Sequence, residues 1–213
     1  MTASVKAGLE RLSLKQGDIA ILNDPFLGGT HLPDISLMAP VYDNSEQLLG
    51  FVANRGHHAD VGGMTPGSLP LSNELYQEGI IIPPLKLVES GVTNDALLEI
   101  ICRNTRTPDE RIGDFNAQIA AIHTGQIRLN DLSKRYGTPS LHSHMSALLD
   151  YSHKLTLAAL SSLPNGQFAF EDYIEDDGLG NEHLKIACTV TLFEGKATFD
   201  FSGTSGETQG CVN

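Results

Sequence analysis

Residues 35–54, ISLMAPVYDNSEQLLGFVAN, contain two apolar runs, 35–42 and 48–54, separated by the polar residues 43–47. Two such runs joined by a loop of about five residues are typical of a β-hairpin. Other short apolar runs broken by Gly and Pro surround them, so residues 1–106 are expected to be rich in strands.

A loop centred on Ser45 sets the register of this hairpin. In that register Asp34 lies opposite Gly56 and His31 lies opposite Ala59. The segment that enters the first strand and the segment that leaves the second therefore emerge at the same end of the ribbon. Loops held by a rigid hairpin are a usual place for ligands.

One short motif, H-x-x-D, occurs in both of these segments. It is His31 to Asp34 (HLPD) in the first and His57 to Asp60 (HHAD) in the second, each beside a Gly-Gly pair. Each motif alone is open to interpretation as a hydrogen-bonded turn. Two copies at one hairpin rim instead predict a metal site, because mixed imidazole and carboxylate ligands suit Mn²⁺, Fe²⁺ or Zn²⁺.

Residues next to these motifs are further candidates. Asn54 and Arg55 are expected to bind substrate, through an amide and through a guanidinium that suits an anionic group. Asn23 and its neighbour Asp24 offer another acceptor, and His58 is expected to support a ligand or pair with Asp34. No catalytic residue is identified. The remaining histidines are expected to be solvated or capping: His123, His142, His144, His153 and His183.

The middle of the chain predicts helices. Residues 107–110, TPDE, combine a capping hydroxyl, a Pro at the first helical position and a Glu that reaches back to the cap. Gly137 ends this helix, and a second is expected over residues 141–163. Two helices joined by a short turn most often form an antiparallel hairpin.

Strands return after this helical part. The expected strands are 168–174, 184–193 and 196–201, with Glu194-Gly195 as a turn. We therefore expect an α+β fold in three segments: a β-rich segment over 1–106, a helical hairpin over 107–163 and a β-hairpin segment over 164–213. The acidic group Asp172, Glu175, Asp176 and Asp177 is interpreted as a solvated loop.

Composition excludes several classes of function. The chain has 14 Lys and Arg against 26 Asp and Glu, a formal charge of −12, which argues against nucleic-acid binding. No apolar stretch is long enough to span a membrane and no signal peptide is evident, so a cytoplasmic protein is expected. Cys102, Cys188 and Cys211 are expected to be free buried thiols.

Several motifs together resemble the hydantoinase B/oxoprolinase family. The likeness covers nearly the whole chain, and members of that family extend further on both sides. The sequence is therefore expected to be an internal piece of a hydantoinase B subunit. The motifs are GDIAILNDP at 17–25, GGTHLPD at 28–34, ANRGHHADVGG at 53–63, EG at 78–79, IPPLKL at 82–87, DF at 114–115, QIAA at 118–121 and DFSGTS at 200–205.

The resemblance implies an ATP-dependent cyclic-amide hydrolase that acts on 5-oxoproline or hydantoins. An A-type partner subunit would bind and use the ATP, within a hetero-oligomer. Carried over by motif, the metal ligands would be His31, His57 and Asp60, with Asp34 less certain and a further acidic ligand upstream of Met1. Because the related acetone carboxylase subunit carries manganese, manganese is the expected ion, with zinc and iron as alternatives.

The resemblance also implies a division of labour. The partner would phosphorylate the ring amide oxygen, and this subunit would add metal-activated water to open the ring. Two other interpretations stay open: a subunit of a related ATP-dependent ketone carboxylase, and a noncatalytic scaffold for the partner.

Overall fold

The computed structural model describes residues 1–212. They divide into two compact units, Met1–Leu141 and a second that begins at His142. Both units combine helices with antiparallel sheet, which confirms the α+β class. No helix within the described part of the chain is long and apolar enough to span a membrane.

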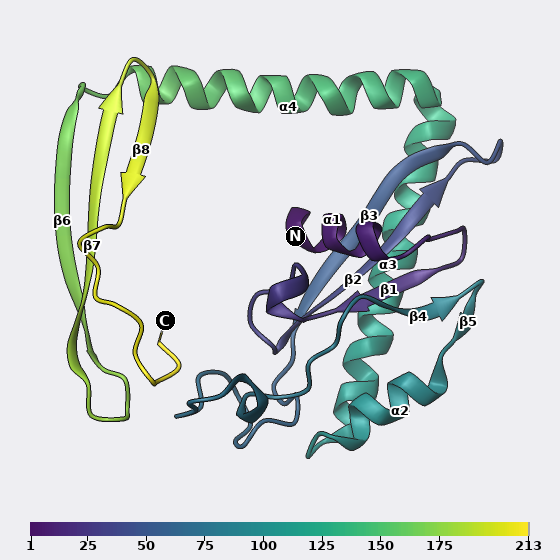
Figure 1. Ribbon diagram of the computed structural model, residues 1–213. Helices are drawn as coiled ribbons and strands as arrows, with labels where there is room; N and C mark the ends of the chain where they lie inside the picture. The colour runs from purple at the N-terminus through teal and green to yellow at the C-terminus, as the bar shows by residue number, and fades with distance from the viewer. Residues whose placement is uncertain (213) are drawn as a thin grey trace. The chain divides into compact units, whose positions relative to one another are not determined.

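The first unit is built on a five-stranded antiparallel sheet (Figure 1). Its strand order is β3-β2-β1-β4-β5, so the predicted hairpin forms one side of the sheet. All four residues of β1 and the inner seven of β2 are buried, as their apolar sequences require. The strands are β1 (Ile19–Leu22), β2 (Asp34–Tyr42), β3 (Leu48–His57), β4 (Leu85–Glu89) and β5 (Val92–Thr93).

Helices cover this sheet. They are α1 (Thr2–Arg11), α2 (Asp95–Arg103) and α3 (Pro108–Tyr136), with short 3₁₀ turns η1 (Pro25–Leu27) and η2 (Leu75–Gln77). The start of α3 is as predicted, although the Thr107 side chain makes no capping hydrogen bond. Helix α2 was not predicted from the sequence, and Asn94 caps it by accepting a hydrogen bond from the Leu97 amide at 3.1 Å.

The core of the first unit lies between the sheet and the helices α2 and α3. Phe115 and Ile122 of α3 are fully buried against sheet residues such as Ile21 and Leu37. Because α3 lies against β2 and β3, it holds the hairpin from one side (Figure 1). Position 118 falls on the same buried face of α3 and is a glutamine, which must find hydrogen-bond partners there.

The second unit contains most of α4 (Thr138–Ser161) and a three-stranded antiparallel sheet in the order β6-β7-β8. The strands are β6 (Gly166–Asp176), β7 (Glu182–Phe193) and β8 (Lys196–Asp200). All three predicted strands are confirmed. Glu194 and Gly195 both have positive φ, as a two-residue hairpin turn requires.

Both helices of the predicted helical hairpin are present, as α3 and α4. Most of α4 belongs to the second unit, so the antiparallel packing of the two helices stays a prediction. Leu141, at the start of α4, is buried against Val41 and Leu49 of the first unit. The apolar spacing in this segment indicated a helix correctly but did not determine what that helix would pack against.

The acidic group after residue 171 is solvated in part but is not a loop. Asp172, Glu175 and Asp176 are exposed residues of β6, whereas Asp177 is buried. Hydrogen bonds from the Asn181 side chain and from the Leu179 and Asn181 amides outweigh burial and lower the pKa of Asp177 to about 2. Asp177 therefore closes the turn between β6 and β7.

All three cysteines are free thiols, as predicted. Cys102 is buried, which raises its pKa, whereas Cys188 and Cys211 are only half-buried. The thiol of Cys102 faces the core and has no partner cysteine, so it packs as a small apolar side chain.

Candidate metal centre

The hairpin register brings Asp34 and His57 together. Asp34 pairs with His57 at the end of the β2–β3 ladder, whereas the sequence register had placed it opposite Gly56. The difference of one residue arises from a bulge between Val41 and Tyr42, near the turn. Because successive side chains on a strand point to opposite faces, this shift decides which side chains meet.

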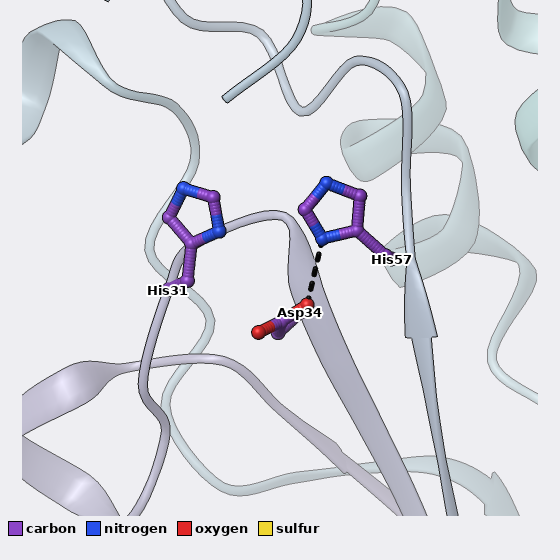
Figure 2. A group of neighbouring side chains, drawn as sticks. All are labelled: His31, Asp34 and His57. Carbon is purple, nitrogen blue, oxygen red and sulfur yellow. Dashed lines mark hydrogen bonds and ion pairs between the residues drawn. The ribbon is translucent and has the colours of Figure 1, made fainter. Parts of the chain in front are cut away.

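Three side chains gather at this rim (Figure 2). The Nδ1 atom of His57 lies 2.8 Å from Oδ1 of Asp34, and the His31 and His57 ring centroids are 5.5 Å apart. One ligand atom from each of the three residues lies within 4.8 Å of the others. Within residues 1–212, this is the one group of three or more His, Cys, Asp or Glu side chains that could hold a metal ion.

The first motif is shaped by a tight turn. The amide of Asp34 donates to the carbonyl of His31 at 2.9 Å, which brings the two side chains to the same side. Upstream, Gly29 approaches the Asn23 carbonyl so closely that a Cβ would lie 2.0 Å from its oxygen. The glycine before the motif is therefore needed for room.

Asp60, a predicted ligand, does not join the group. Its Oδ1 accepts hydrogen bonds from the Gly62 amide at 2.9 Å and Arg106 Nη1 at 3.0 Å, and its Oδ2 accepts from the Arg106 amide at 2.7 Å. Burial would raise the pKa of Asp60, but these hydrogen bonds outweigh it and lower the pKa. The carboxylate thus fixes the loop after residue 60.

The two H-x-x-D motifs differ because their backbones differ. His31 and Asp34 flank a turn, whereas His57 ends a strand and the chain then bends inward to Asp60. Equal spacing in sequence therefore does not give equal geometry. Arg106, which binds the Asp60 carboxylate, lies 46 positions further along the chain, and no local sequence pattern indicates this contact.

Arg55, predicted to bind substrate, is engaged by three hydroxyl groups. Its Nε donates to Ser36 at 3.0 Å, Nη1 to Thr30 at 3.1 Å and Nη2 to Ser4 at 2.9 Å. Thr30 in turn donates to Oδ2 of Asp34 at 3.4 Å. The guanidinium therefore ties α1, β2 and the first motif together, and all three of its nitrogens are occupied.

Asn54, the other predicted substrate residue, is bonded within the protein. Its Nδ2 donates to the backbone carbonyl of Gln118 at 2.7 Å, and its Oδ1 accepts from Gln118 Nε2 at 3.0 Å. Asn23 is likewise occupied: it donates to Leu32 and Ile80 carbonyls and accepts from the Ile82 amide. These amides therefore join segments of the fold, and substrate binding by Asn54 stays a prediction.

His58 is a core histidine and does not contact Asp34. It is 2% exposed, its Nε2 lies 2.9 Å from Gln118 Oε1, and its ring packs on Phe115 with centroids 4.8 Å apart. Burial lowers the pKa of His58, more than the Gln118 bond and the nearby Asp114 charge raise it. The neutral ring therefore links the strand end to α3.

Two residues shape this region without having been predicted as site residues, Gln118 and Arg106. Gln118 had a usable signal, because a polar residue at helical spacing between Phe115 and Ile122 on an apolar face must find buried partners. Arg106 had no comparable signal.

Two imidazoles and one carboxylate are a familiar ligand set for catalytic divalent ions, since they leave coordination positions open. The His57 side chain is 53% exposed and that of Asp34 24%, so small molecules can reach the group from solvent. The donor atoms, their spacing and their accessibility thus fit Mn²⁺, Fe²⁺ or Zn²⁺.

Comparison with known proteins identifies relatives across the whole chain. The family model Hydantoinase B/oxoprolinase matches residues 1–213. The chain is 39% identical over 206 residues to an uncharacterised protein of Methanocaldococcus jannaschii, covering 96% of this chain and 36% of that protein. It is 34% identical over 228 residues to 5-oxoprolinase 1 of Arabidopsis thaliana, covering 94% of this chain and 18% of that protein.

A solved structure shares this fold. The crystal structure of an ATP-dependent caprolactamase from Pseudomonas jessenii matches with a TM-score of 0.82 and 29% identity, over 92% of this chain and 34% of that one. The chain therefore spans about a third or less of the length of these proteins.

Proposed function

This chain belongs to the hydantoinase B/oxoprolinase family, and on that premise we propose that it takes part in the ATP-dependent hydrolysis of a cyclic amide. The observation that carries the proposal is the group His31, Asp34 and His57, whose ligand atoms lie within 4.8 Å of one another. These three residues would hold a divalent ion, with manganese expected first and zinc or iron as alternatives. When bound, such an ion supplies an acidified water and stabilises negative charge on oxygen.

The residues around the group prepare it for this role. The hydrogen bond between Asp34 and His57 orients both side chains before any ligand arrives. Arg55, acting through Thr30, holds the other oxygen of Asp34 and places a positive charge near the rim. The exposed edge of His57 leaves room for a small ring. Water that attacks the amide carbon at this rim would open the ring.

A cyclic amide resists water, and this is why we include ATP in the proposal. Transfer of a phosphoryl group to the amide oxygen makes the amide carbon more electrophilic. After water has added to that carbon, the C–N bond breaks, the nitrogen takes a proton and an acyl phosphate forms. A second water then hydrolyses the acyl phosphate to the carboxylate and free phosphate. Residues 62–68, GGMTPGS, are rich in glycine but lack the Gly-Lys-Ser/Thr of a phosphate-binding loop. We therefore propose that an A-type partner subunit binds and uses the ATP and that 5-oxoproline, a hydantoin or a similar lactam is the substrate.

The test uses the full-length protein together with its ATP-using partner. His57→Ala and Asp34→Ala are each expected to lose bound metal and ring opening while ATP binding by the partner is kept. His123→Ala, which removes an exposed histidine of α3, is the matched control and should change neither. Retention of metal and of ring opening in both variants would contradict the proposal.

A further inference from the structure

We propose that Gln118 is a positioning residue that fixes the spacing of the metal-binding side chains. This inference rests on the proposed function. Gln118 comes from α3 and touches none of the three ligands. Its side chain instead bonds to the residues that directly follow two of them in sequence, Ile35 after Asp34 and His58 after His57.

Every polar atom of the Gln118 side chain is used. Nε2 donates to the Ile35 carbonyl at 3.0 Å and to Asn54 Oδ1 at 3.0 Å, and Oε1 lies 2.9 Å from His58 Nε2. Because Nε2 faces two acceptors, the amide orientation is fixed and Oε1 must accept from His58. Gln118 is 8% exposed and His58 2%, so water cannot easily replace these bonds.

The position of this amide requires Gly56. A Cβ at residue 56 would lie 2.9 Å from Cδ of Gln118, 3.0 Å from Nε2 and 3.1 Å from Oε1. Gly56 is not among the residues with positive φ, so it is present for space and not for backbone conformation. Gly56 pairs with Ile35, next to the last pair of the β2–β3 ladder. The side-chain amide of Gln118 therefore packs against this end of the hairpin, beside the site.

This location explains why the contact matters for metal binding. The Asp34–His57 pair is the last of the β2–β3 ladder, and ladder ends open more readily than ladder centres. His57 is largely exposed, so packing does not hold its ring. Gln118 bonds to Ile35 in β2 and to His58 just beyond β3, each one residue from a ligand, and so keeps the ligand atoms at a spacing that one ion can bridge. Partners outside the ligand shell typically change metal affinity by about 10–100-fold.

The experiment compares two glutamines of α3 in the full-length protein. Gln118→Met keeps the length of the side chain and removes its hydrogen bonds. The matched control is Gln126→Met, because Gln126 Nε2 donates to the Pro40 carbonyl of β2 at 3.1 Å, further along the same strand and away from the ligands. Gly56→Ala is a second, independent perturbation of the Gln118 amide.

The readouts are Mn²⁺ affinity by calorimetry, the visible spectrum of bound Co²⁺, and urea unfolding. Gln118→Met and Gly56→Ala are expected to weaken Mn²⁺ binding by about 10–100-fold and to alter the Co²⁺ spectrum. Gln126→Met should leave affinity within about twofold and the spectrum unchanged, although it too loses a hydrogen bond. A change in the spectrum separates positioning from simple loss of stability.

The other outcomes are distinguishable. If the unaltered protein binds neither ion, the proposed function fails and this inference fails with it. If it binds, and Gln118→Met keeps its affinity and spectrum, the positioning role is overturned and the proposed function stands. If Gln118→Met does not fold, Gly56→Ala decides. If both fail to fold while Gln126→Met folds, Gln118 serves global stability and the inference is overturned.

Discussion

Replacing Asp60 with asparagine should destabilise the first unit and leave its metal affinity unchanged. The introduced side chain keeps one acceptor oxygen, which can still receive the Gly62 amide and Arg106 Nη1. Its new amide group replaces Oδ2 and faces the Arg106 backbone N–H, which donates to that oxygen at 2.7 Å. Two donors then oppose each other at a position where the side chain is 4% exposed.

The magnitude follows from these losses. A hydrogen bond to a charged group contributes about 1.5–3 kcal/mol, and the ion pair with Arg106 adds at most about 1 kcal/mol because that side chain is 46% exposed. We therefore expect a loss of about 2–4 kcal/mol in the free energy of unfolding. With a urea dependence of about 2 kcal/mol per molar, the unfolding midpoint should fall by about 1–2 M.

The assay pairs urea unfolding with Mn²⁺ titration of the folded protein. Asp34→Asn is the companion variant, since it removes a proposed ligand and should lose Mn²⁺ affinity. If Asp60→Asn kept its unfolding midpoint but lost Mn²⁺ affinity by more than about tenfold, Asp60 would be a ligand. That result would refute the assignment of its carboxylate to Arg106 and the loop.

Three further predictions concern the fold. Phe115→Ala should lower the free energy of unfolding by about 3–5 kcal/mol in urea unfolding, because the ring is fully buried and packs on His58; a loss under about 1 kcal/mol would contradict this. Burial would raise the pKa of Asp18, but hydrogen bonds from two amides and from Lys86 outweigh it and lower the pKa below its ordinary value. The difference in unfolding free energy between the protein and Asp18→Asn should therefore be full above about pH 4 and shrink as the pH falls further. A difference that does not change with pH in acid titrations would refute this. Gly113→Ala should raise the thermal midpoint through about 0.5–1 kcal/mol of helix propensity, because nothing lies within 4 Å of the added Cβ, and a lower midpoint would count against the packing described.

The sequence predicted the hairpin because its signals are local. Two apolar runs and a five-residue loop define the strands β2 and β3, and a tight turn brings His31 and Asp34 to one side. The register was wrong by one residue, because the bulge near Tyr42 depends on how the turn packs and not on the apolar pattern.

What the sequence could not predict depends on distant partners. Asp60 is hydrogen-bonded to Arg106, 46 positions away, and Asn54 is hydrogen-bonded to Gln118, 64 positions away. A single motif therefore does not indicate which partner a buried polar group will find, since such groups are bonded wherever the fold offers one.

The metal site can be tested most directly by anomalous diffraction from crystals of the full-length protein grown with Mn²⁺, with data collected on both sides of the manganese edge. We expect one strong peak at the rim of β2 and β3, about 2.0–2.3 Å from a ring nitrogen of His31, a ring nitrogen of His57 and a carboxylate oxygen of Asp34. A peak at another position, or none there in protein that carries one equivalent of manganese, would contradict the account.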